Sequence, residues 1–283
     1  MKLRAKHTTT YLYNEPVSIC HTDVRLAPRE LHNQHVLEHH LTVHPRPERM
    51  FGRTDYFGNG VTYFSLHEPH QTLTITADCL VEKDDTVLLE PGLTPPWEEA
   101  CGDSWGTAKF QSLNGYEYIF ESPRIIRGRA FADYAMPSFT PNRPVLEAAV
   151  DLCHRIYSEF HYDRDATTVA TSVAEVIETR RGVCQDFAHF AIACLRSLGL
   201  AARYVSGYVK TSAELTGGEA SHAWLAVFCP GFGWFDLDPT NDQLVNGDHI
   251  TLAYGRDYSD VAPVKGVALG GGEQVVNVSV AVS

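Results

Sequence analysis

One cysteine stands at the head of an apolar run in the stretch RRGVCQDFAHF, residues 180–190. The residues after Cys184 leave almost no polar face, which predicts a buried helix that begins at the cysteine and ends at Leu198, before Gly199. Unpaired backbone N–H groups and the positive end of the helix dipole favour an anion at the start of a helix. Because the thiolate is the nucleophilic form of cysteine, Cys184 is a candidate nucleophile.

The alternative is structural, because free cysteines usually behave as small buried hydrophobes. Cys184 alone leaves both interpretations open. A second stretch, ASHAWLAVFCPGFGWFDLDPTN at residues 220–241, bears on the choice. It predicts two strands joined by a Pro-Gly-Phe-Gly turn, with His222 at the start of the first strand and Asp238 near the end of the second.

This hairpin is expected to bring His222 and Asp238 together across its two strands. In that position a carboxylate fixes the orientation and the tautomer of an imidazole. A histidine on a strand is more often structural, and an aspartate before proline is more often a turn residue. Cysteine, histidine and aspartate together, however, are the set of groups that nucleophilic acyl transfer requires.

In this order, GVCQDFAHF, SHAWLAVF and GWFDLDPTN resemble the cysteine, histidine and aspartate motifs of the transglutaminase-like branch of the papain-type cysteine enzymes. The resemblance implies that Cys184 is the nucleophile, His222 the general base and acid, and Asp238 the residue that orients the imidazole. Asp236 is the neighbouring alternative, but the family's aspartate directly precedes Pro-Thr, as Asp238 does. The family includes cross-linking enzymes, peptidases, amidases and proteins without known activity, so the resemblance gives no substrate.

The resemblance extends over nearly the whole chain. The segments HTTTYLYNEPV, VRLAPRE, HPRPE and DYFGNGVTYF are similar to the β-rich domain that precedes the catalytic domain in bacterial members, and HITLAYGRDYSDVAPVKGV is similar to the same subgroup. It implies an α+β fold in which an N-terminal antiparallel β domain is followed by a papain-like, transglutaminase-like catalytic domain. In the second domain a central buried helix is expected to pack on an antiparallel sheet.

The oxyanion-stabilising group is the point at which the chain departs from the family pattern. Animal transglutaminases use a tryptophan upstream of the cysteine for this purpose, and no tryptophan lies between residues 106 and 223. Tyr162, in FHYDRD, is a candidate substitute, and the backbone N–H of Cys184 is another donor. Tyrosines at such positions are more often simply packed, so both interpretations of Tyr162 stay open.

Alternation and turn signals divide the chain into three parts. Residues 1–83 alternate like strands, and Asn59-Gly60 predicts a tight hairpin turn with positive φ, so this part is an antiparallel β domain. Residues 84–142 contain scattered prolines and glycines and predict a connector with short elements. Residues 143–283 form the catalytic domain.

The third part begins with two segments whose residue patterns predict helices. Apolar residues recur at helical spacing after Pro144 and predict a helix as far as Phe160. Ser172, followed three residues later by Glu175, is a capping-box pattern that predicts a second helix ending near Arg180.

The composition narrows the class of protein. The 283 residues carry a formal charge of -12 without a basic run, which argues against nucleic acid and against an anionic membrane as partners. The N-terminus lacks the apolar core of a signal peptide, and no run of about 18 apolar residues occurs, so a cytoplasmic location is expected. Peptides, proteins or small amides are the expected partners, and the oligomeric state is open.

No cofactor and no metal are expected. The seven cysteines have no CxxC spacing, which argues against a zinc ribbon and against a disulfide framework. Five histidines between residues 32 and 44 include the helical ligand spacing of His35 and His39. Their segment alternates like a strand, however, and lacks HExxH, so a solvated sheet face is favoured over a metal site.

The resulting hypothesis is thiol-dependent acyl transfer on a carboxamide or peptide bond through a Cys184 thioester. Hydrolysis, as in a cysteine peptidase or amidase, is favoured because no residues specify an amine acceptor site and water is always present. The alternatives are a transglutaminase that cross-links protein glutamines, and a scaffold or binding module that retains the fold without turnover.

Overall fold

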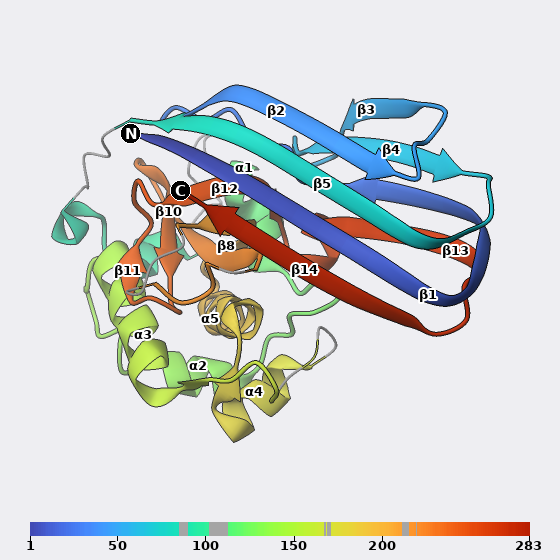
Figure 1. The fold of residues 1–283 in the computed structure, drawn as a ribbon. Helices are drawn as coiled ribbons and strands as arrows, with labels where there is room; N and C mark the ends of the chain where they lie inside the picture. The colour runs from blue at the N-terminus through green and yellow to red at the C-terminus, as the bar shows by residue number, and fades with distance from the viewer. Residues whose placement is uncertain (85–89, 102–112, 167, 169–170, 211–214, 219) are drawn as a thin grey trace.

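The computed structural model describes residues 1–283 except 85–89, 102–112, 167, 169–170, 211–214 and 219. The chain is arranged in three layers: helices, a five-stranded sheet and a seven-stranded sheet (Figure 1). Strand pairing in both of these sheets is antiparallel, and the α+β fold predicted from the sequence is confirmed.

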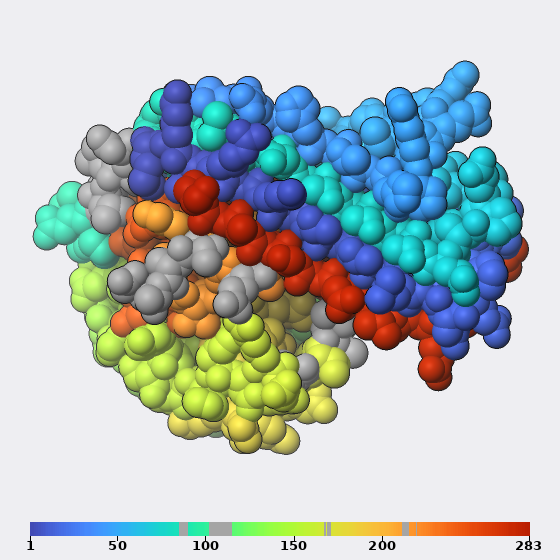
Figure 2. Space-filling view, in the orientation of Figure 1, coloured from blue at the N-terminus to red at the C-terminus, as the bar shows by residue number. Residues whose placement is uncertain are grey.

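The outer layer is built around one long strand. The seven-stranded sheet consists of β1 (Lys2–Val24), β2 (Gln34–His44), β3 (Met50–Thr54), β4 (Gly60–Leu66), β5 (His70–Lys83), β13 (Val264–Gly270) and β14 (Gln274–Val282). The first half of β1 pairs with β5 and β14, and its second half pairs with β4 and β13. Along β5, apolar residues from Leu73 to Val81 are buried in alternation with the partly exposed Thr74, Thr76, Asp78 and Leu80, as the period of two predicts. This sheet projects past the helical part of the molecule (Figure 2).

The end of the predicted third part of the chain, residues 143–283, lies in the outer sheet. Its last two strands, β13 and β14, pair with β1 and therefore complete the outer sheet; Thr8, for example, lies opposite Ser279. Alternation identifies a strand but does not say which strand it pairs with, so the sequence pattern could not separate these residues from the catalytic part. The other boundaries, at residues 83 and 142, stay predictions.

The hairpin between β3 and β4 exists, but its predicted turn is wrong. Thr54 pairs with Gly60, so the loop comprises Asp55 to Asn59. The positive φ lies at Gly58, at 78°, and the carboxylate of Asp55 accepts hydrogen bonds from the backbone of Phe57 and Asn59. The Asp55 side chain therefore organises a longer loop, and the side chain of Asn59 is used elsewhere.

The middle layer carries the central helix on one face. The five-stranded sheet has the order β11 (Gln243–Leu244), β10 (Gly233–Asp238), β9 (His222–Cys229), β8 (Ala202–Val209) and β12 (His249–Gly255). Helix α5 (Cys184–Ser197) packs on β9 and β8, and its side chains from Phe187 to Leu195 are buried in the main core. Tyr208, Ile250 and Leu252 point to the opposite face, where they pack against the outer sheet.

Four of the other helices in the described residues surround α5 or lie near the sheet edge. They are α2 (Arg129–Ala135), α3 (Val145–Glu159), α4 (Val173–Thr179) and α6 (Tyr258–Val261). The helix predicted after Pro144 and the capping box of Ser172 and Glu175 are both present, and α4 ends at Arg180 with a φ of 52°. Two short parallel strands, β6 (His161–Tyr162) and β7 (Arg181–Gly182), lie before α5.

The predicted connector contains short elements in its described residues. These are 3₁₀ turns at Pro91–Leu93, Trp97–Ala100 and Glu117–Ile119, together with α1 (Leu113–Tyr116) and α2. The connector is fastened at Phe120 by Arg196 of α5, which is fully buried and donates to the carbonyl oxygens of Phe120, Ala202 and Arg256. One guanidinium therefore joins the connector, β8 and the end of β12.

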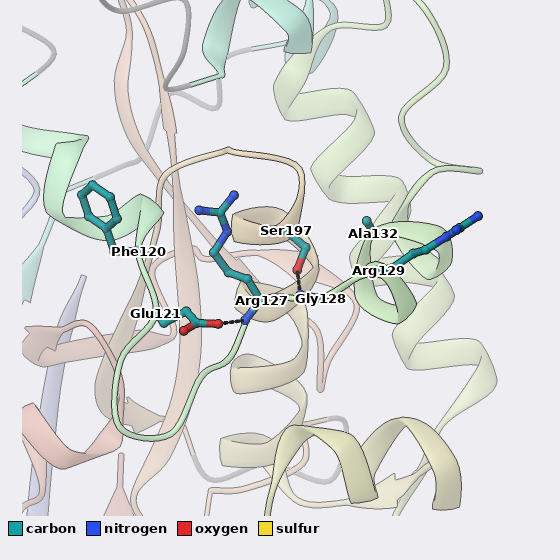
Figure 3. Close-up of a pocket in the computed structure, with 7 residues that line it drawn as sticks. All are labelled: Phe120, Glu121, Arg127, Gly128, Arg129, Ala132 and Ser197. Atoms are coloured by element: carbon teal, nitrogen blue, oxygen red, sulfur yellow. Dashed lines mark hydrogen bonds between the residues drawn. The ribbon is translucent and has the colours of Figure 1, made fainter.

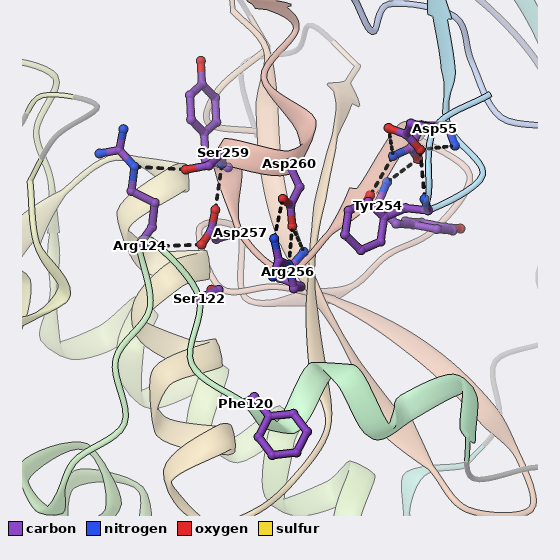
Figure 4. Close-up of polar contacts among 12 residues, drawn as sticks. Asp55, Phe120, Ser122, Arg124, Tyr254, Arg256, Asp257, Ser259 and Asp260 are labelled. Carbon is purple, nitrogen blue, oxygen red and sulfur yellow. Dashed lines mark hydrogen bonds and ion pairs between the residues drawn. The ribbon is translucent and has the colours of Figure 1, made fainter. Parts of the chain in front are cut away.

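A second set of contacts holds the connector against α6. The buried carboxylate of Asp257 accepts from the backbone N–H groups of Arg124, at 2.9 Å, and Ser259, at 2.8 Å (Figure 4). Asp260 forms an ion pair with Arg256 at 2.9 Å. The next backbone N–H, that of Tyr258, donates to His189 Nε2 at 3.1 Å, so this network also fixes a histidine of α5.

Candidate active site

Cys184 is the first residue of α5, as the sequence predicts. Val183, directly before it, has an extended backbone, and its N–H donates to Asp186 Oδ2 at 2.9 Å, which closes the first turn of the helix. A Cβ atom on Gly182 would come within 2.8 Å of the Asp186 side chain, so glycine allows this close approach. The exposed fraction of Cys184 is 7%, which places the thiol at the edge of the core.

His222 and Asp238 are brought together by the predicted hairpin. Leu237 lies opposite Leu225, which puts Asp238 one step nearer to His222 at the open end of the hairpin. His222 Nε2 lies 2.8 Å from Asp238 Oδ2, and both side chains are fully buried. The other ring nitrogen, Nδ1, has no nitrogen or oxygen partner in the described part of the chain.

The charged forms of His222 and Asp238 stabilise each other. Burial on its own would lower the pKa of His222, but the Asp238 carboxylate and the neighbouring Cys184 raise that pKa to about 10. Burial would likewise raise the pKa of Asp238, yet the interaction with His222 and His249 holds it well below its usual value. The geometry therefore favours an imidazolium that lies between a carboxylate and the sulfur of Cys184.

Asp236, the alternative to Asp238, lies elsewhere on the same strand. Its Oδ2 accepts from Trp224 Nε1 at 3.2 Å, and no bond to His222 is formed among the described residues. Burial raises the pKa of Asp236, and Arg203 opposes this shift. Asp236 thus belongs to a separate polar contact behind Trp224.

Tyr162 lies at the end of β6, beside the loop that leads into Cys184. It pairs with Gly182 of β7, and its ring packs edge-on against Phe187 at 6.3 Å. Burial raises the pKa of the phenol, and the nearby Cys184 raises it further. The position is compatible with an oxyanion donor, and the role of Tyr162 stays a prediction.

Two further residues contact Asp238 that the sequence did not single out. Asn241 Nδ2 lies 2.7 Å, and His249 Nε2 3.2 Å, from the same Oδ2 that His222 contacts. The backbone N–H of Thr240 donates to Oδ1 at 2.9 Å. Asn241, three residues after Asp238, could have been noticed as a turn-stabilising side chain, whereas His249 on a strand looks like any core histidine.

A glycine turn covers His222. Asn241 accepts from the backbone N–H of Thr216 at 2.8 Å and donates to its carbonyl oxygen at 3.2 Å, which holds the turn in place. Gly217 has a φ of 96°, and a Cβ on it would come within 2.5 Å of His222 Nδ1. Gly217 is therefore required both by its backbone conformation and by its contact with the imidazole.

The remaining thiols and His189 are in packing positions. Burial raises the pKa of Cys79 to about 11 and that of Cys229 to about 12. His189 Nε2 accepts from a backbone N–H, and burial lowers its pKa to about 3, so the ring is neutral.

Within the described residues, one group could offer three ligands to a metal ion. The ligand atoms of His222, Asp238 and His249 all lie within 4.8 Å of one another. Their nitrogen-to-oxygen distances of 2.8 and 3.2 Å are those of hydrogen bonds, which already satisfy the carboxylate. In the histidine-rich stretch, His35 is exposed on β2 and bonded to Glu30 and Asp84.

A surface depression of about 670 Å³ lies at the far end of α5 (Figure 3). It includes Ser197, whose hydroxyl accepts from the backbone of Gly128 at 3.1 Å, and Glu121, which accepts from the backbone of Arg127 at 2.8 Å. Because Cys184 is at the opposite end of the same helix, this depression is separate from the candidate site. No helix in the described parts of the chain is long and apolar enough to cross a membrane.

A buried helix with a thiol at its start, packed on an antiparallel sheet that carries a histidine and an aspartate, is a papain-like arrangement. Residues 133–239 match the model of the transglutaminase-like superfamily, and residues 3–82 match that of the bacterial transglutaminase-like N-terminal region. The chain belongs to the transglutaminase-like superfamily.

Similar proteins are bacterial. The uncharacterized protein Rv2569c of Mycobacterium tuberculosis is 41% identical over 299 residues, which cover 99% of this chain and 91% of the relative. The uncharacterized protein ML0607 of Mycobacterium leprae is 33% identical, with coverage of 100% and 98%. A crystal structure from Cytophaga hutchinsonii, provisionally described as a cysteine protease, superposes with a TM-score of 0.76 at 24% identity over 100% of this chain and 90% of that one. This last likeness concerns the fold.

Proposed function

We propose that the protein is a thiol-dependent acyl-transfer enzyme in which Cys184, His222 and Asp238 act together on a carboxamide or peptide bond. The observation that carries the proposal is the 2.8 Å bond between His222 and Asp238, with the ring beside Cys184. A protein that only used the fold as a scaffold would have no physical reason to bury a carboxylate and an imidazole against a thiol.

The proposed reaction has two stages. The sulfur of Cys184 bonds to the carbonyl carbon, and the carbon–nitrogen bond breaks as His222 transfers its proton to the leaving ammonia or amine. A thioester remains. Water, deprotonated by His222, then attacks the thioester carbon, the carbon–sulfur bond breaks, and the released thiolate and imidazolium restore the starting state.

Asp238 contributes by holding the imidazole. Its hydrogen bond to Nε2 leaves Nδ1 as the nitrogen that exchanges a proton with Cys184 and the leaving group. The backbone N–H of Cys184 and the hydroxyl of Tyr162 are the proposed donors to the oxyanion.

Hydrolysis is favoured over amine transfer because water needs no dedicated binding site. The alternative is a transglutaminase, in which a primary amine replaces water in the second stage. Both share the thioester, so they differ only in the acceptor.

The test uses a library of peptides and glutamine amides in H₂¹⁸O, with a fluorescent primary amine present, and mass spectrometry of the products. One ¹⁸O atom in a new carboxylate, absent with Cys184→Ala, supports hydrolysis. Incorporation of the amine supports the transglutaminase. If no thioester and no product form with any substrate, while Cys184 is alkylated no faster than Cys101, the scaffold hypothesis is the better one.

A further inference from the structure

The geometry points to His249 as a positioning residue that fixes the carboxylate of Asp238 for its bond to His222. This inference rests on the proposed function, because the orientation of His222 matters only if its Nδ1 serves Cys184. His249 lies outside the three motif segments and begins β12.

The two histidines meet at one oxygen atom. His222 Nε2 is 2.8 Å and His249 Nε2 is 3.2 Å from Asp238 Oδ2, and their ring centroids are 6.2 Å apart with an interplanar angle of 43°. Asn241 reaches the same oxygen at 2.7 Å from the loop after β10. Three donors from three different elements therefore define where this oxygen lies.

The protonation state of His249 follows from its surroundings. Its exposed fraction is 0%, and its Nδ1 has no hydrogen-bond partner in the parts of the chain that the structure describes. A proton on Nδ1 would leave a buried donor unpaired, whereas Nε2 has a carboxylate to donate to. Nε2 is therefore the nitrogen through which His249 donates to Asp238.

The groups around His249 leave Asp238 as the acceptor for its Nε2. Asp238 and His222 lie on one side, and Trp224 packs edge-on at 5.2 Å. Asp236, which is bonded to Trp224, lies further back on β10 and interacts with His249 electrostatically. Only Asp238 among the carboxylates forms a hydrogen bond with His249 within the described residues.

Thr240 and Asn241 hold the Asp238 carboxylate from the loop that follows β10, at 2.9 Å and 2.7 Å. His249 adds a hydrogen bond from β12, so the oxygen that His222 contacts is held from a second element of the fold. The strand β12 is in turn fastened to the outer sheet, because Gln34 and Asn59 bond to the backbone of Thr251 and Tyr254. His249 thereby connects the N-terminal sheet to the site without placing any of its residues there.

The test compares two amide variants of His249. The amide nitrogen of glutamine reaches the place of Nε2, whereas that of asparagine reaches only the place of Nδ1. We expect His249→Gln to keep the alkylation rate of Cys184 by iodoacetamide within about threefold of wild type, and His249→Asn to lower it about tenfold or more and to change its pH profile. His7→Asn, at a buried histidine far from Asp238, controls for general loss of stability.

A readout on the wild-type protein is independent of catalysis. Two-bond ¹H–¹⁵N correlations of the histidine rings, assigned with His249→Gln, are expected to show a proton on Nε2 of His249. A tautomer of His249 with its proton on Nδ1 alone overturns the inference, and so does an unchanged rate and pH profile in both variants. If instead Cys184 in the wild-type protein shows no preferential reactivity, while the expected proton on Nε2 is found, the proposed function fails and the hydrogen bond stands.

Discussion

The side chain of Gln34 pairs with the backbone of Thr251 as a neighbouring strand would. Its Nε2 donates to the Thr251 carbonyl oxygen at 2.9 Å, and its Oε1 accepts from the Thr251 N–H at 2.9 Å. Asn59 repeats the pattern with Tyr254, at 2.8 and 2.9 Å. Two side-chain amides, one at the start of β2 and one in the loop between β3 and β4, thus pair with the outer edge of β12, which is the last strand of the middle sheet.

Replacing Gln34 is expected to weaken the whole molecule. Gln34→Leu leaves the buried N–H of Thr251 without its partner, whereas the Thr251 carbonyl keeps the backbone N–H of Arg29 at 3.1 Å, so the free energy of unfolding is expected to fall by about 1–3 kcal/mol. Urea denaturation measures this change. Gln71→Leu, at an exposed glutamine of the same sheet, is the control, and an equal effect of the two substitutions would contradict the role assigned to Gln34.

Asp238 and Asp236 are expected to differ sharply. Asp238→Asn keeps the shape of the side chain but removes the charge and allows His222 the wrong tautomer, so turnover is expected to fall about 10³-fold with little change in the melting temperature. Asp236→Asn retains an acceptor for Trp224 and is expected to have little effect. Steady-state kinetics on a substrate from the library measures both, and the reverse order would refute the assignment of Asp238.

Among the seven thiols, Cys184 is expected to react first. Brief treatment with substoichiometric iodoacetamide near pH 6, followed by mass spectrometry, should find modification concentrated there, because burial raises the pKa of Cys79, Cys153, Cys194 and Cys229 and blocks access to them. His222→Ala should largely remove the preference. Equal labelling of Cys184 and Cys101 in the wild-type protein would speak against an ion pair at the site.

Gly217 offers a matched comparison with Gly231. Both have positive φ, 96° and 81°, but a Cβ on Gly217 meets His222 at 2.5 Å whereas nothing lies within 4 Å of a Cβ on Gly231. Both alanine variants share the backbone strain of about 1–2 kcal/mol. Only Gly217→Ala is expected to lower turnover, by tenfold or more, since the imidazole or the turn must move; similar kinetics in the two variants would exclude this contact as important.

His7 is expected to make the protein acid-sensitive. Burial lowers its pKa to about 4, from a usual value of 6.5, so between these values the unfolded chain binds a proton that the folded protein does not. The free energy of unfolding therefore falls as pH drops from about 6.5 to about 4, with a slope of up to about 1.4 kcal/mol per pH unit from this group. His7→Gln should flatten the slope in urea titrations at several pH values, with His189 supplying a residual dependence; an unchanged slope would show that His7 titrates outside this range.

Local signals were sufficient for the elements that carry the candidate site. Three signals each act within a few residues: the apolar run after Cys184, the capping box at Ser172 and the turn between β9 and β10. They can therefore be recognised in the sequence without knowledge of the tertiary structure. The hairpin also fixed the relation of His222 to Asp238, because antiparallel pairing follows from a short turn.

Contacts between residues that are far apart in the sequence could not be predicted from these local signals. Asn59 was interpreted as a turn residue because Asn-Gly is a strong hairpin signal, yet its amide is used by β12 nearly 200 residues later. His249 contacts Asp238 because its strand, β12, pairs with β8 at the sheet edge. The sequence around His249 contains no signal that predicts this contact. Pairing between distant segments depends on the complete fold rather than on local pattern.

The return of β14 to β1 has a consequence for biosynthesis. Arg4 and Ser283 exchange backbone hydrogen bonds at 2.8 and 2.9 Å, so β1 can pair with β14 only after the long segment between them has been translated. At roughly 5–20 residues per second, that delay is on the order of tens of seconds. During this time one edge of β1 offers unpaired N–H and carbonyl groups to other nascent chains. We therefore expect the yield of folded protein in a cell to depend on how well chaperones protect β1 during translation. Formation of the central helix is not expected to limit this yield.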